Sequence, residues 1–65
     1  MAIHLRAARV NAGLTQAQVA EKLGKNKNTI IAYEKYTSKP DIDTAKSLAS
    51  LYGMTVDDII WSVKG

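Results

Sequence analysis

The residues best suited to chemistry are three consecutive polar side chains, Asn26, Lys27 and Asn28. A lysine ammonium donates hydrogen bonds to guanine O6 or N7, and an asparagine amide pairs with adenine in the major groove of DNA. Apolar Ile30 and Tyr33 follow at helical spacing. The pattern predicts a short helix that these two residues hold to the body of the protein, while its polar, basic front enters a groove of DNA.

Two further residues of this helix, Ile31 and Ala32, lie off its apolar face. Ile31 either contacts thymine methyl groups or fills a gap beside Tyr33, because isolated exposed apolar residues are common. Ala32 permits a close approach of the helix to DNA without adding a hydrogen bond. With the three polar residues, they form the predicted base-reading front. Nearby polar residues are expected to contact phosphates, which position a protein on DNA without reading sequence. These predicted phosphate contacts are Thr15, Lys35, Thr37, Ser38 and Lys39.

The helix that precedes this one completes a helix-turn-helix. Val19 supplies an apolar anchor, and Ala20 is small where the following helix must cross closely. Thr15 and Asn26 are the expected N-caps of the two helices. Gly24 can adopt the left-handed conformation that ends a helix. Two short helices joined across one glycine are typical of a DNA reader whose second helix lies in the major groove.

The rest of the chain is predicted to form three more helices. The first covers about residues 3–12. The fourth starts at Pro40 or Asp41 and ends at Gly53, and the fifth is capped by Thr55. Strand-like alternation is absent from the sequence. We therefore expect an all-α fold, a compact five-helix bundle in which all 65 residues form a single domain.

Composition argues against an enzyme. Cysteine is absent, which removes disulfides, thiolate chemistry and cysteine-based metal sites. His4 is the only histidine, and neither cysteines nor clustered carboxylates stand beside it. The acidic pairs at positions 41 and 43 and at positions 57 and 58 fall in predicted first turns, where they complement the helix dipole. Without a glycine-rich phosphate loop, the sequence predicts no catalytic residue, no cofactor and no metal site.

The distribution of charge points to a polyanionic partner. The net charge is +3, and residues 1–40 hold seven lysines and arginines against two glutamates. Residues 41–65 are mildly acidic. A basic first half suits DNA on one face of the domain. The sequence has no apolar run of about 18 residues and no signal-peptide layout, so we expect a cytoplasmic protein without a membrane partner.

Four motifs together resemble the lambda-repressor-like helix-turn-helix family, also called the Cro or xenobiotic-response-element type. They are GLTQAQVAEKLG at residues 13–24, NTIIAYE at residues 28–34, the single Pro40, and SLASLYGMTVDDII at residues 47–60. Members of that family are five-helix domains that bind operator DNA, usually as two-fold dimers. The resemblance implies a sequence-specific transcriptional regulator, with repression as the family expectation. It would read a short palindromic operator in double-stranded DNA through the major groove with its third helix.

The resemblance also assigns roles to individual residues. Gln16 opens the second helix where related proteins place a glutamine on the DNA backbone or on an outer base. Arg9 and Glu34 correspond to a structural ion pair between the first helix and the end of the third. Tyr36 stands where a glycine is common, so a positive φ at this position would strain the tyrosine.

Residues near the C-terminus are the expected homodimer contacts. Trp61 follows two isoleucines, and a helical period turns it away from at least one of them, either toward a second subunit or onto its own domain. The predicted dimer contacts are Val56, Ile60, Trp61 and Val63. The alternative hypothesis is a protein-interaction module on the same fold. Such an antitoxin or antirepressor would act mainly through a protein partner, since fold does not determine function.

Overall fold

Capping residues place the helices of the domain. In the computed structural model, which describes residues 2–63, the Thr15 Oγ1 accepts a hydrogen bond from the Gln18 amide at 3.1 Å. The Gln18 side chain accepts one from the Thr15 amide at 2.8 Å. This capping box begins the second helix, and Gly24 ends it at φ 65°. The Asn26 side chain caps the third helix by accepting from the Asn28 amide at 2.9 Å. The predicted caps are confirmed.

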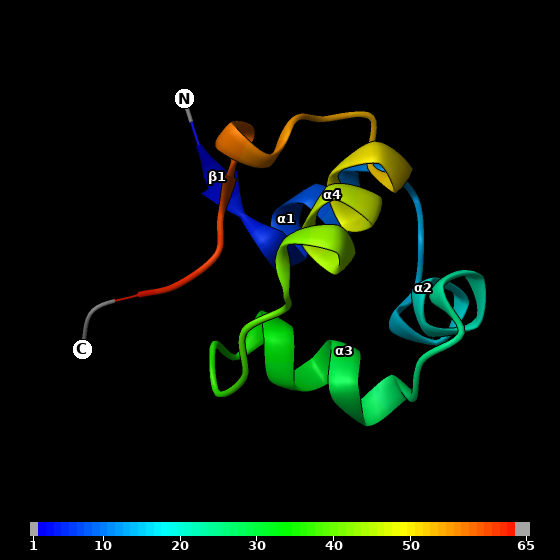
Figure 1. Ribbon diagram of the computed structural model, residues 1–65. Coiled ribbons are helices and arrows are strands. Elements are labelled where there is room, and N and C mark those ends of the chain that lie inside the picture. Colours follow the sequence, from blue (N-terminus) through cyan, green and yellow to red (C-terminus); the bar gives the residue numbers. More distant parts are fainter. Residues whose placement is uncertain (1, 64–65) are drawn as a thin grey trace.

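Four α-helices form most of the described chain (Figure 1). The helix-turn-helix pair packs closely, and the segments at residues 3–4 and 59–60 lie side by side in another part of the molecule. In chain order the elements are β1 (Ile3–His4), α1 (Leu5–Asn11), α2 (Gln16–Leu23), α3 (Lys27–Glu34), α4 (Ile42–Leu51), a 3-10 turn (Val56–Asp58) and β2 (Ile59–Ile60). Among residues 2–63, none of the helices has the length and apolar character needed to cross a membrane.

The core draws one fully buried large side chain from each of the four helices. Leu5, Val19, Ile30 and Leu48 are each at most 1% exposed. Tyr33 lies beside them and is also buried. Because α3 contributes both Ile30 and Tyr33, its apolar side is held against α2 and α1 while its remaining surface faces outward. The predicted anchoring of this helix is confirmed.

The predicted fifth helix is wrong. After Thr55 the chain makes one 3-10 turn and then becomes extended, and β2 pairs in parallel with β1. Ile3 faces Ile59 in this register, so the start of the predicted first helix is also a strand. Branched isoleucines favour extended backbone when a partner strand is present, and a short helix has little stability of its own. Residues 2–63 therefore form a mostly helical fold with four helices and a small strand pair.

Candidate nucleic-acid interface

The outward side of α3 carries the residues predicted to read bases. Lys27 and Asn28 are exposed at its N-terminal end, and Ile31 and Ala32 are partly exposed one turn later. Asn26 is exposed as well, but its side-chain oxygen is occupied by the capping hydrogen bond. Its amide N–H groups remain available for a ligand. We call Asn26, Lys27, Asn28, Ile31 and Ala32 together the α3 front. Its polar N-terminal end also holds the positive end of the helix dipole, which attracts phosphate.

A buried ion pair lies behind the α3 front. The Arg9 Nε donates to Glu34 Oε2 at 2.7 Å, and its Nη2 donates to Oε1 at 3.3 Å. The two side chains are only 11% and 4% exposed. Arg9 also donates through Nη1 to the Leu14 carbonyl at 2.8 Å. The pair expected from the resemblance is present. It ties the end of α3 to α1 and to the loop that follows α1.

Gln16 connects the start of α2 to this ion pair. Its Nε2 donates to Glu34 Oε1 at 3.0 Å, and its side chain is half-buried. The contact places the first turn of α2 beside the C-terminal end of α3. Thr15 is exposed next to it, with its hydroxyl oxygen used in the capping box. The sequence placed Gln16 at the start of a helix but offered no signal for its contact with Glu34.

The loop after α3 exposes four residues that were predicted to contact phosphates, namely Lys35, Thr37, Ser38 and Lys39. The amide groups at positions 37 and 38 donate to the Ala32 carbonyl at 3.0 and 3.4 Å. This carbonyl therefore holds the loop against the end of the helix. An exposed lysine stands at each end of the loop, so the loop continues the basic surface of the α3 front.

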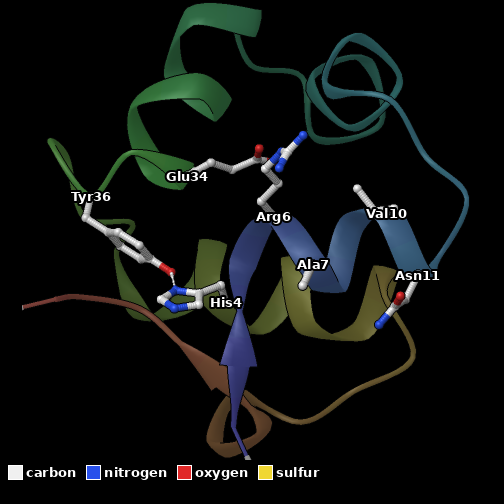
Figure 2. A pocket seen from close by; sticks show the side chains of 7 residues that line it. All are labelled: His4, Arg6, Ala7, Val10, Asn11, Glu34 and Tyr36. Carbon is white, nitrogen blue, oxygen red and sulfur yellow. Dashed lines mark hydrogen bonds between the residues drawn. The ribbon is translucent and has the colours of Figure 1, made fainter.

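Tyr36 occupies the conformation that would suit a glycine, with φ 62°. Its hydroxyl contacts His4 Nδ1 at 2.7 Å, accepts from the Leu5 amide at 3.4 Å and donates to the Ile60 carbonyl at 3.2 Å. Figure 2 shows the phenol ring directed at the His4 imidazole. The contacts join the loop after α3 to both strands. The sequence indicated the strained position of Tyr36. Its hydrogen-bond partners lie 24 to 32 residues away along the chain, and no sequence pattern pointed to them.

Beside α1 lies an open cavity of about 630 Å³ (Figure 2). Its lining combines exposed apolar and polar groups of that helix with the Tyr36 ring. The lining residues are His4, Arg6, Ala7, Val10, Asn11, Glu34 and Tyr36. Within residues 2–63 there is no cluster of three histidine, cysteine, aspartate or glutamate side chains able to hold a metal ion.

The hydroxyl of Tyr52, the residue that ends α4, is buried and has no hydrogen-bond partner in the described part of the chain. Burial raises the pKa of Tyr52 to about 12, and the negative charge of Glu34 adds to the rise, while Arg9 opposes it. Tyr52 therefore stays neutral at physiological pH. Its buried hydroxyl adds polarity to the interior but no contact.

The predicted dimer contacts lie on a second surface. Trp61 packs partly against the core and donates from Nε1 to the Val56 carbonyl at 2.8 Å. It lines an apolar groove of about 310 Å³ whose other walls are Lys39, Pro40, Ile42, Ala45 and Val56. Ile60 is half-buried, and Val63 is exposed. Trp61 thus packs on its own domain and still contributes to an open apolar groove.

Comparison with known proteins identifies similar chains. A family model for helix-turn-helix proteins matches residues 5–59. The cryptic phage CTXphi transcriptional repressor RstR of Vibrio cholerae is 39% identical over 56 residues, which are 86% of this chain and 50% of that protein. The HTH-type transcriptional regulator ImmR of Bacillus subtilis is 39% identical over 56 residues, 86% of this chain and 44% of the regulator.

An uncharacterized HTH-type transcriptional regulator of Methanocaldococcus jannaschii is 41% identical over 46 residues, which are 71% of this chain and 70% of that protein. The chain spans about half the length of the RstR and ImmR proteins that it matches. No solved structure matches the chain significantly.

Proposed function

The chain belongs to the lambda-repressor-like helix-turn-helix family of DNA-binding transcription regulators, and we propose that it binds a short palindromic operator and represses transcription. In this proposal the α3 front enters the major groove of double-stranded DNA. One observation carries it: the apolar side of α3 is buried while its polar N-terminal end is exposed. A helix held in this way can present Lys27 and Asn28 to base edges without leaving the core.

Two groups of side chains would contact different parts of the DNA. Lys27, Asn28 and Ile31 would contact bases, the last through thymine methyl groups. The loop at residues 35–39 and Thr15 would contact phosphates on either side of the groove. The positive charge of residues 1–40 supports a strong, salt-dependent electrostatic contribution to affinity. The cytoplasm is the proposed location because operator DNA is accessible there.

A homodimer would read the two halves of the operator. The apolar groove at Trp61 and the exposed side chains of Ile42 and Val63 support this surface as the subunit contact. Ile42 is 62% exposed and lines the groove, so it belongs to one continuous apolar surface of the kind that subunits cover. Two reading helices related by two-fold symmetry would meet half-sites about 34 Å apart, one turn of DNA.

Selection of binding sites from a random duplex library tests the proposal. We expect an enriched palindrome, with affinity that falls steeply as salt is raised. Lys27→Ala and Asn28→Ala should each relax the preference at particular base pairs by about 1–3 kcal/mol. Lys35→Ala should instead weaken binding evenly across sequences and lower the salt slope by about one. Lys22→Ala is the matched control, since this lysine is exposed on α2 outside the proposed contacts.

Two results would contradict the proposal. Unchanged sequence preference in both the Lys27→Ala and Asn28→Ala variants would mean that α3 is wrongly placed in the groove. Absence of any enriched sequence at low salt, with a folded protein, would favour the alternative in which a protein partner is the main ligand. A pull-down against purified candidate partners would then be the next measurement.

A further inference from the structure

The half-buried Gln16 side chain, in the first turn of α2 next to Thr15, contacts the buried ion pair. Its Nε2 donates to Glu34 Oε1 at 3.0 Å. Arg9 holds the same carboxylate through two donors at 2.7 and 3.3 Å, and the Glu34 side chain is 4% exposed. Because the carboxylate is fixed from α1 and nearly closed to water, it offers Gln16 a rigid acceptor in one place.

An ionised carboxylate accepts hydrogen bonds and donates none. The Gln16 amide must therefore turn its NH2 group toward Glu34. The flipped amide would set its carbonyl oxygen against a carboxylate oxygen, so two acceptors would face each other without a proton. The carbonyl oxygen of Gln16 and one of its two N–H groups remain for another ligand.

A carbonyl acceptor beside an N–H donor matches the major-groove edge of adenine, which offers an N6 donor and an N7 acceptor. Guanine offers two acceptors there, N7 and O6, and would oppose the carbonyl oxygen. We propose that Glu34 is a positioning residue that fixes the Gln16 amide, so that Gln16 reads adenine in each operator half-site. This inference rests on the proposed function only in requiring that the first turn of α2 meets DNA.

The amide orientation can be tested in the free protein by NMR of the side-chain NH2 groups. Gln18 serves as the internal control, because its side-chain oxygen accepts from the Thr15 amide and its NH2 does not contact a carboxylate. We expect slower hydrogen exchange for the Gln16 NH2 than for that of Gln18, and loss of this difference in Glu34→Gln. Equal exchange of the two amides in the unmodified protein would overturn the fixed orientation.

The base preference is tested with the selected operator and derivatives changed at each base pair. We expect Gln16→Ala to lose about 5- to 150-fold discrimination at one base pair per half-site, the range for a bidentate contact. Glu34→Gln should lose part of the same discrimination, leave other base pairs unchanged, and add nothing in the Gln16→Ala background. Circular dichroism of each variant reports whether it is folded. Should Glu34→Gln be unfolded, Glu34→Asp replaces it, because it keeps the charge but withdraws the carboxylate from Gln16.

The inference would be overturned by equal weakening of all sequences by Glu34→Gln or by independent effects of the two substitutions in the double variant. A guanine preference at the base pair that Gln16→Ala affects would overturn it as well. An operator that is enriched without any dependence on Gln16 would reject adenine reading and leave the proposed function standing. Failure to enrich an operator would reject both, while the NMR comparison would still decide the amide orientation.

Discussion

Tyr36 allows a quantitative test of how tertiary contacts offset backbone strain. It is the only non-glycine residue with positive φ in the part of the chain that the structure describes. Left-handed backbone costs a residue with a Cβ about 1–2 kcal/mol. Its hydroxyl contacts His4, the Leu5 amide and the Ile60 carbonyl (Figure 2). Tyr36→Phe removes these contacts and keeps the strain, whereas Tyr36→Gly removes both.

The expected sizes follow from these contacts. A hydrogen bond contributes about 0.5–1.5 kcal/mol net, and the contact with His4 is exposed, so water replaces that partner. The partly buried contacts with the Leu5 amide and the Ile60 carbonyl remain. We expect Tyr36→Phe to lower the free energy of unfolding by about 1–2 kcal/mol. The free energy of unfolding of Tyr36→Gly should lie within about 1 kcal/mol of that of Tyr36→Phe, because relief of backbone strain offsets the lost packing of the ring.

Urea and thermal unfolding followed by circular dichroism measure both variants. For a domain of this size, each 1 kcal/mol corresponds to a shift in Tm of about 4–8 °C. His4→Ala is the matched control, because it removes the exposed partner alone and should change stability little. A Tyr36→Phe variant as stable as the unmodified protein would refute a stabilising role for the hydroxyl. A glycine variant that is much less stable than the phenylalanine variant would refute the offset of strain.

Four further predictions concern other parts of the fold. Tyr52→Phe removes a buried hydroxyl that has no partner among residues 2–63, so stability in urea should hold or rise by up to about 2 kcal/mol. Cap hydrogen bonds from residues 44 and 55 lower the pKa of Asp41 and Asp58 below 3.8. The stabilisation from each ionised carboxylate is therefore complete above pH 3.8 and is lost as the pH falls through the lowered pKa of the folded protein. Asp41→Asn should make this loss of stability smaller in acid unfolding curves. Apart from its two chain neighbours, no described residue would lie within 4 Å of a Cβ at Gly24, so Gly24→Ala should cost only the strain of φ 65°, about 1–2 kcal/mol in thermal unfolding. Trp61→Ala should weaken self-association in sedimentation velocity while the helical content is retained.

Each of these expectations has a contrary result. Marked destabilisation by Tyr52→Phe would show that the hydroxyl has a partner, and an unchanged acid limb in Asp41→Asn would reject the cap as its source. A much larger loss for Gly24→Ala would indicate a clash rather than strain. Dimerisation that does not depend on Trp61 would move the subunit contact away from the apolar groove.

Much of the fold was predictable because its signals are local. The Thr15 and Asn26 caps, the left-handed Gly24 and the apolar spacing of Ile30 and Tyr33 act within a few residues of one another. Helix formation depends on such short-range contacts, so α2 and α3 were placed correctly from the sequence. The exposed position of Lys27 and Asn28 follows from the same periodicity.

The sequence by itself determined the helix-turn-helix, the anchored side of α3 and the family of the chain. Only the tertiary structure decided the pairing of β1 with β2 and the contacts of Tyr36 and Gln16. Ile59 and Ile60 are extended because β1 lies beside them, 56 residues away along the chain. Tyr36 keeps its strained backbone alongside contacts with both strands, and Gln16 is oriented by Glu34. These features depend on partners that meet only after the helices have packed, and such long-range pairing overrides local propensity.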